Sequence, residues 1–156
     1  PTAKLVVVGD GGARASHDAL TRSLGVEGRV IFTGSVPHSE VYSYMAAADV
    51  FLSLYDLSNV GNPLLEAMTL GKCIITLDVG NTAHEITDRK TGILLTYETL
   101  DSLGERLVEL YEDPALRRKL GEDAAAYARE HYWTWESRMD AEIQRVQALF
   151  LQEHRM

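Results

Sequence analysis

The feature that most constrains this chain is a regular alternation of short apolar runs with segments of helical periodicity. The runs carry β-branched residues on consecutive positions, as strands do when a parallel sheet is covered on both faces. The predicted strands are 5–9, 30–33, 50–54, 74–77 and 92–95, and the predicted helices between them are 13–24, 39–47, 63–70 and a short 82–86. This alternation predicts an α/β fold, a Rossmann-like open parallel sheet with right-handed crossovers.

The pattern changes after residue 95, where strand signals stop and leucines recur at helical spacing. Asp113 followed by Pro114 is typical of an N-cap and a first helical residue. A further apolar stripe runs toward Phe150. We therefore expect one domain over 1–156, with a sheet part over about 1–96 and a helical tail over about 97–156.

Composition excludes several classes of protein. Apolar residues make up 46% and charged residues 24%, so the chain is not disordered as a whole. The net charge of −8 argues against a nucleic-acid partner. No apolar run approaches the ~20 residues of a membrane span. The single cysteine, Cys73, cannot form an internal disulfide, and the N-terminal residues show no charged-then-apolar pattern of a secretory signal, so we expect a cytoplasmic location.

The chain enters its first buried-type strand almost at once, at Leu5. A doubly wound domain rarely starts so abruptly, so this pattern predicts that the chain is a piece of a longer protein. The alternative is that residues 5–9 are simply the first strand.

Two segments follow predicted strands and so lie where ligands bind in open α/β sheets. The turn Gly9-Asp10-Gly11-Gly12 allows a close backbone approach, but Arg14 prevents a full G-x-G-x-x-G pattern. The second segment, 33–40, taken alone favours a plain capped loop.

The segment 55–68 carries the richest chemistry. Asn62 and Pro63 predict a helix start that leaves the N–H groups of Leu64 and Leu65 free for an anion. We expect Glu66 in the first helical turn, where its carboxylate can accept hydrogen bonds from a vicinal diol such as a ribose. The alternative is a purely structural role, since a carboxylate near a helix N-terminus gains about 0.3–1 kcal/mol from the helix dipole.

Other catalytic patterns are absent from the sequence. The five histidines show no metal-ligand spacing and there is no G-x-S-x-G elbow. We expect Cys73 to be a small core residue rather than a nucleophile.

Motifs along nearly the whole chain resemble the C-terminal, donor-binding domain of GT-B glycosyltransferases, specifically the retaining family 4. The carriers of this resemblance, in order, are LVVVGDGG, LGVEGRVIFTGSVPHSEVYSYMAAADVFLSL, GNPLLEAMTLGKCIITLDVGNTAHEI, TGILL and DPALRRKLGEDAAAYARE with WTWE. The resemblance implies that Glu66 holds the ribose hydroxyls of a nucleotide sugar. It also implies that backbone groups bind the rest of the donor: Asn59, Val60, Gly61, Asn62, Leu64 and Leu65 at the diphosphate, Val36 at the base, and Gly9, Asp10 and Gly11 along the donor cleft.

The chain departs from the family at one position. The family pattern has a glutamate eight positions before Glu66, and Ser58 stands there in this sequence. Three interpretations stay open: Asp56 substitutes for that glutamate, a variant donor pocket uses Ser58, Asn59 and Asn62, or the chain is a non-catalytic relic.

The resemblance implies transfer of a sugar from a nucleoside-diphosphate sugar with retention, without a metal or other cofactor. It favours UDP-sugars over GDP-sugars. It also implies that an N-terminal acceptor domain, and a first strand and helix of this domain, are missing, and that only the missing domain would contact a membrane. Two other classes stay open: a non-catalytic nucleotide- or partner-binding domain, and an unrelated flavodoxin-like α/β domain.

Overall fold

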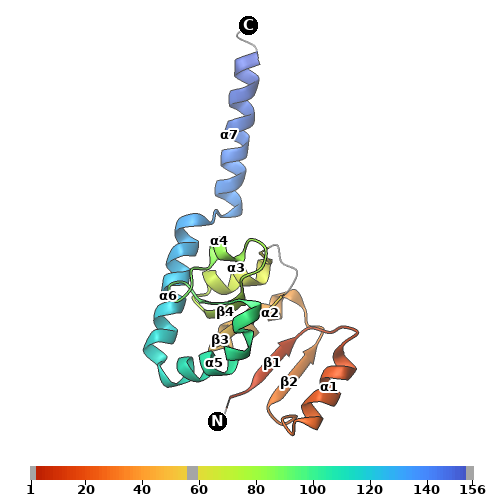
Figure 1. Cartoon of the computed structure of the whole chain (residues 1–156). Helices are drawn as coiled ribbons and strands as arrows, with labels where there is room; N and C mark the ends of the chain where they lie inside the picture. The colour runs from red at the N-terminus through yellow and green to blue at the C-terminus, as the bar shows by residue number, and fades with distance from the viewer. Residues whose placement is uncertain (1–2, 56–59, 154–156) are drawn as a thin grey trace. The chain divides into compact units, whose positions relative to one another are not determined.

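The computed structural model, which describes residues 3–55 and 60–153, confirms the α/β fold class (Figure 1). It consists of two compact units, Pro1–Ala48 and Asp49–Met156. The division falls inside the sheet part expected over about 1–96. The assignment of a single domain therefore stays a prediction.

The first unit is a two-stranded parallel sheet with two helices. Its elements are β1 (Leu5–Val8), α1 (Arg14–Ser23), β2 (Val30–Gly34) and α2 (His38–Ala47). Strand β1 pairs with β2 from Leu5 opposite Val30, and the register shifts after Val7. The α1 side chains Arg14 and His17 cover Phe32 of β2, with the Arg14 guanidinium 4.4 Å from the ring centroid.

Strand β1 is more exposed than the sequence predicts. Leu5, Val6 and Val8 are 46%, 43% and 37% exposed, so the expected burial on both faces is wrong for this strand. The reason is that β1 is hydrogen-bonded on one side only, to β2. A sheet of two strands offers too few neighbours to cover an apolar strand on both faces.

The second unit has a three-stranded parallel sheet in the order β3-β4-β5. The elements are β3 (Val50–Ser53), α3 (Asn62–Thr69), β4 (Cys73–Leu77), α4 (Thr82–Glu85), β5 (Ile93–Leu95), the 3-10 helix η1 (Tyr97–Ser102), α5 (Leu103–Glu112), α6 (Pro114–His131) and α7 (Trp135–Glu153). The predicted strands of this unit are confirmed to within one residue at each end.

The core of the second unit lies on both faces of its central strand, β4, which is buried at all five positions. Successive strand residues point to opposite faces. Ile74 packs in a cluster with residues of α3 and α6, whereas Ile75 packs on the other face with residues that include Leu110 of α5 and Leu120 of α6. The expected burial on both faces is thus confirmed for β4.

The helical tail follows the sequence pattern closely. Asp113 caps α6, because its Oδ1 accepts a hydrogen bond of 2.9 Å from the Leu116 N–H, and Pro114 is the first helical residue. Helix α7 carries exposed apolar side chains, among them Trp135 and Val146. Within the described ranges, no helix combines the length and the apolar character that crossing a membrane requires.

Candidate functional site

The carboxyl ends of β3, β4 and β5 meet at one edge of the second unit, since the three strands are parallel neighbours. Thr76 Oγ1 donates a 2.8 Å hydrogen bond to the Ser53 carbonyl, and the Asp78 N–H donates a 2.7 Å bond to the Leu95 carbonyl. Leu54, which follows β3, and the loop 78–81, which follows β4, thus leave from adjacent strand ends. This is the edge where open α/β sheets bind ligands.

Helix α3 begins one residue differently from the prediction. Gly61 is the N-cap, with extended dihedral angles, and Asn62 and Pro63 are the first two helical residues, so the expected Asn62 N-cap is wrong. Among the described residues, no side chain caps the helix. The shift is tolerated because the first-turn N–H groups have no intrahelical partner, so a proline without an N–H fits at either position.

The Leu64 amide is not free, contrary to the prediction. Its N–H donates a 2.9 Å hydrogen bond to the Gly61 carbonyl, and the residue is only 2% exposed. A tight first turn of the 3-10 type uses up this donor. Leu64 is therefore part of the core, and a ligand-facing amide at Leu65 stays a prediction.

Glu66 is the fifth residue of α3, one turn beyond its start rather than in the first turn. The residue is half-buried. Among the described residues, no ion pair or side-chain hydrogen bond engages its carboxylate. A carboxylate without a partner, on the first helix after the edge strand β3, is free to accept hydrogen bonds from a ligand.

Three other predicted residues, Asp56, Ser58 and Asn59, lie outside the described residues. Val60, at the end of that segment, packs against the apolar cluster of α3 and α6. The Val60 side chain is therefore part of the core packing of the second unit. A role for its backbone at a diphosphate stays a prediction.

The first unit brings its own predicted residues to one edge. Gly9 has φ +128°, which favours glycine, and its N–H donates a 3.1 Å hydrogen bond to the Gly34 carbonyl at the end of β2. Asp10 Oδ1 accepts a 2.8 Å bond from the Gly11 N–H. Val36 follows Gly34 by two residues, so the β1 turn and Val36 leave from adjacent strand ends.

The loop 78–81 after β4 also lies at the second unit's edge. It falls within the motif GNPLLEAMTLGKCIITLDVGNTAHEI, but none of its residues is among the predicted site residues. It closes on itself: Thr82 Oγ1 donates a 2.8 Å hydrogen bond to the Val79 carbonyl, and Gly80 has φ +60°. Gly80, three residues after the fully buried strand β4, was the signal that could have identified it.

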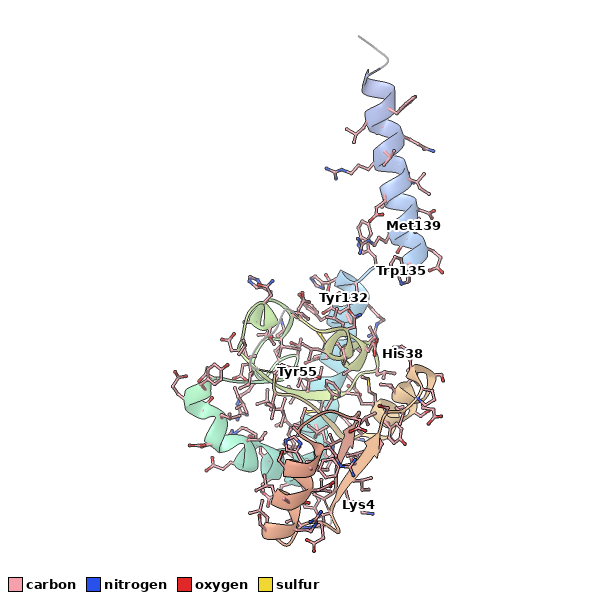
Figure 2. All side chains as sticks on the ribbon, turned by 90° about the vertical axis from the view of Figure 1, so that its right-hand side faces the viewer. Lys4, His38, Tyr55, Tyr132, Trp135 and Met139 are labelled. Atoms are coloured by element: carbon pink, nitrogen blue, oxygen red, sulfur yellow. The ribbon has the colours of Figure 1, made fainter. Side chains whose placement is uncertain are left out.

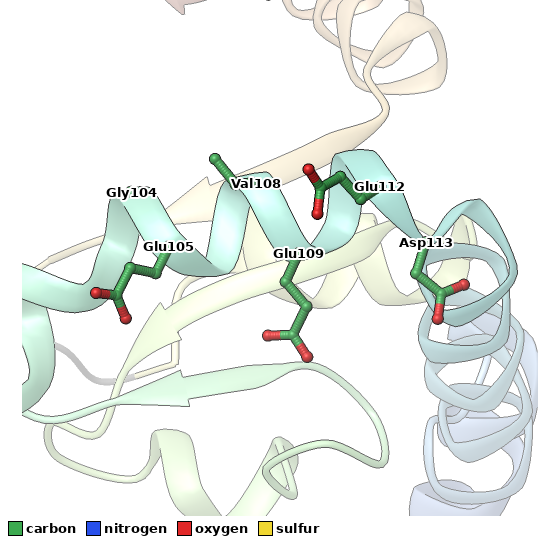
Figure 3. Close-up of a pocket in the computed structure, with 6 residues that line it drawn as sticks. All are labelled: Gly104, Glu105, Val108, Glu109, Glu112 and Asp113. Carbon is green, nitrogen blue, oxygen red and sulfur yellow. The ribbon is translucent and has the colours of Figure 1, made fainter.

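A hollow of about 750 Å³ runs along α5, and Figure 3 shows its lining. It is lined by Gly104, Glu105, Val108, Glu109, Glu112 and Asp113. Hydrogen bonds from Arg89 at 2.7 Å and Arg106 at 2.8 Å, led by that of Arg89, hold the pKa of the Glu109 carboxyl below its usual range. With four carboxylates, this hollow repels a diphosphate and is unsuited to a nucleotide.

Other catalytic groups are not assembled in the described part of the chain. No group of three histidine, cysteine, aspartate or glutamate side chains there is arranged to hold a metal ion. Cys73 is buried in the core, and burial raises the pKa of its thiol to about 11. The prediction that Cys73 is a core residue is confirmed.

Parallel strands joined by crossover helices define an α/β domain. Residues 1–127 match the family model described as Glycosyl transferases group 1. The chain belongs to this family, whose members include enzymes named as glycosyltransferases. The predicted recognition is thereby confirmed at the level of the glycosyltransferase family.

Individual relatives and structures support the same assignment. The chain is 32% identical over 130 residues to the N-acetyl-alpha-D-glucosaminyl L-malate synthase of Bacillus anthracis, a match that covers 83% of this chain and 34% of the relative. Sucrose-phosphate synthase from Thermosynechococcus elongatus superimposes with a TM-score of 0.82 at 24% identity, over 96% of this chain and 39% of that one. Anabaena Alr3699/HepE in complex with UDP gives a TM-score of 0.81 at 22% identity, over 95% and 41%.

These structures confirm the GT-B type of α/β fold. The chain spans about a third of the length of the curated relatives that it matches.

Proposed function

We propose that this chain is the donor-binding part of a longer glycosyltransferase, namely the C-terminal domain of a GT-B enzyme of the retaining family 4. It would bind a nucleoside-diphosphate sugar, whose sugar is transferred to an acceptor held by the rest of the protein. A cytoplasmic location, and membrane contact only through the rest of the protein, stay predictions.

The relatives support a nucleotide-sugar donor without fixing the base. Alr3699/HepE, which shares the fold, has structures in complex with UDP and with UDP-glucose. A sequence relative from Corynebacterium glutamicum, 29% identical over 143 residues, is named as a GDP-mannose-dependent mannosyltransferase. UDP-sugars remain the favoured donors, and UDP is the first probe.

The observation that carries the proposal is the half-buried Glu66 carboxylate, which has no described side-chain partner and stands on α3 beyond β3. A carboxylate can accept two hydrogen bonds from the vicinal hydroxyls of a ribose, and charge-assisted bonds of this kind are strong. Glu66 would therefore position the nucleotide rather than transfer protons.

The remaining predicted residues would act on the diphosphate and the base. Backbone amides at Asn59–Asn62 and Leu65 would face the leaving diphosphate, where oriented dipoles stabilise the charge that develops in the transition state. Contacts of Gly9–Gly11 and of the Val36 backbone with the donor stay predictions. Asp56 and Ser58 are the candidates for contacts to the sugar.

A two-ligand titration tests the ribose contact. UDP and 2′-deoxy-UDP are titrated into the ¹⁵N-labelled chain and into its Glu66→Ala variant, and the amide shifts of residues 60–62 and 64–66 are followed. We expect UDP to bind the parent chain about tenfold more tightly than 2′-deoxy-UDP does, since a hydrogen bond to a charged group contributes about 1.5–3 kcal/mol. In the Glu66→Ala variant this preference should vanish.

The outcome that would contradict the donor site is UDP binding that does not respond to Glu66→Ala or to loss of the 2′-hydroxyl. Glu66→Gln is the matched control, because it keeps an oxygen acceptor and the side-chain size while removing the charge. Its affinity should lie between those of the parent chain and Glu66→Ala.

Ser58, in place of the family's glutamate, favours a second candidate function, a non-catalytic nucleotide- or partner-binding domain. The two are separated by a transfer assay with UDP-sugars on the longest available form of the protein. Transfer supports the glycosyltransferase, whereas binding without transfer supports the second candidate. We expect the 156-residue chain alone to transfer no sugar, because orientation of donor and acceptor requires both binding surfaces.

A further inference from the structure

The loop 78–81 at the candidate edge is continuous with the short helix α4, so whatever fixes α4 also fixes the loop. Two backbone hydrogen bonds join them: the Thr82 N–H donates to Val79 at 3.3 Å, and the His84 N–H donates to Asn81 at 3.0 Å. A four-residue helix has little stability of its own. Its position must therefore come from tertiary contacts.

One phenol provides such a contact. Tyr132, labelled in Figure 2, lies at the C-terminal end of α6, and its hydroxyl donates a 2.6 Å hydrogen bond to Glu85 Oε2 on α4. The same hydroxyl oxygen lies 3.2 Å from Met68 Sδ, and Met68 is fully buried on α3, two residues after Glu66. A single hydroxyl thus touches both elements that leave from the candidate edge.

A second tyrosine of α6 reinforces this arrangement. The Tyr127 hydroxyl donates a 3.1 Å hydrogen bond to the His84 carbonyl, and the Tyr127 and Tyr132 rings meet edge to face with centroids 6.1 Å apart. Both rings pack against the cluster that contains Met68 and Ile86. The end of α6 is therefore fixed in the core, and it holds α4 at two points.

The chemistry of the Tyr132–Glu85 pair suits a permanent contact. A phenol that donates to a carboxylate forms a short, charge-assisted bond. Burial, and then the Glu85 carboxylate, raise the pKa of the Tyr132 phenol above its ordinary value. The phenol consequently keeps its proton, and the bond persists, throughout the neutral range.

We infer that Tyr132 and Glu85 are positioning residues of the candidate donor site, which hold the loop 78–81 at a fixed distance from the α3 helix that carries Glu66. The inference rests on the proposed function. It adds that the C-terminal end of α6, remote in sequence from both loop and helix, sets how well the site is preorganised for a nucleotide.

Tyr132→Phe is the direct test, because it keeps the ring packing and removes only the hydroxyl. Amide hydrogen exchange is measured on the full chain, with the Thr82 and His84 amides as reporters. We expect exchange at these amides to rise about tenfold, as for the loss of one hydrogen bond to a charged group. UDP affinity should fall several-fold in parallel.

Two variants of Glu85 test the acceptor of this hydrogen bond. Glu85→Leu removes the acceptor and should raise amide exchange at Thr82 and His84. Glu85→Gln keeps an oxygen acceptor and should retain most of the parent chain's protection against exchange. Asp113→Ala is the stability control, because it removes the cap at the opposite end of α6 and touches nothing on α4. It should lower global stability without raising local exchange at Thr82 and His84.

The outcomes separate the two hypotheses. Unchanged exchange in Tyr132→Phe overturns the positioning contact. Raised exchange with unchanged UDP affinity shows a merely structural bond and overturns the inference, while the proposed function stands. If UDP binds neither the parent chain nor any variant, the proposed function fails, and the site role of Tyr132 fails with it.

Discussion

Gly121 of α6 faces Gly71 of the α3–β4 turn with no room for a side chain between them. A Cβ at Gly121 would overlap the Gly71 carbonyl oxygen and lie 3.3 Å from the Cys73 amide nitrogen. Because both obstacles are backbone atoms, they cannot move aside as a side chain would. This close approach lets α6 pack directly on the turn that leads into the central strand.

Gly121→Ala should therefore destabilise the chain even though alanine favours helices. Overpacking of this kind costs about 1–3 kcal/mol, which outweighs the helix-propensity gain of roughly 0.5–1 kcal/mol. The measurement is urea unfolding followed by circular dichroism, with the midpoint shifted to lower urea concentration.

Gly104→Ala is the matched control for this prediction. Gly104 also lies in a helix, α5, but an added Cβ there has no neighbour within 4 Å. The control variant should be as stable as the parent chain or slightly more stable. Equal stability of the Gly121 and Gly104 variants would contradict the packing argument.

The Asp113 cap makes a second prediction on stability. Asp113→Ala removes the acceptor of the Leu116 N–H and should cost about 1 kcal/mol of unfolding free energy. Asp113→Asn retains an oxygen at the same place, and asparagine caps as well as aspartate does. In thermal unfolding, the parent chain and Asp113→Asn should therefore have similar midpoint temperatures, and Asp113→Ala should have a lower one.

The strands were predictable because local pattern and tertiary position agree at them. The run around Ile74 and Ile75 is apolar at successive positions, and both of its faces are buried. At β1 the same pattern misleads, since Leu5 and Val6 are exposed in the two-stranded sheet. The apolar pattern of a sequence indicates which faces of a strand are suited to burial. Whether those faces are buried depends on the strands and helices that pack against them.

The candidate site was predictable in outline and not in detail. A glycine, asparagine and proline before an apolar run located the α3 start, and Glu66 within it, from the sequence alone. The cap register and the occupied Leu64 amide depend on dihedral angles that no short motif specifies. Contacts between distant segments, such as Tyr132 with Glu85, carry no local signal.

The buried Cys73 thiol predicts a decline of stability in alkali. Its pKa is about 11 in the folded chain against an ordinary 9.0, so the unfolded chain loses this proton first. The free energy of unfolding keeps its full value below pH 9. It falls as the pH rises from 9 toward 11, because the unfolded chain then binds fewer protons than the folded chain. Urea midpoints measured at successive pH values check this.

Cys73→Ala supplies the comparison. Its stability is lower at neutral pH because a buried sulfur is lost, but its decline above pH 9 should be shallower than that of the parent chain. A thiol reagent offers a second readout: the native Cys73 should react far more slowly than the urea-unfolded chain. Parallel pH profiles for parent and variant would contradict the assignment.

Nucleotide binding should be independent of divalent metal. The proposed diphosphate contacts are backbone amides at a helix start, which stabilise an anion through their dipoles and need no bridging cation. We expect the same UDP affinity in millimolar Mg²⁺ and in EDTA, measured by calorimetry. A metal-bridged site would instead lose UDP binding in EDTA and regain it with Mg²⁺. That result would contradict a diphosphate site at the α3 start and favour a site where carboxylates hold the metal ion.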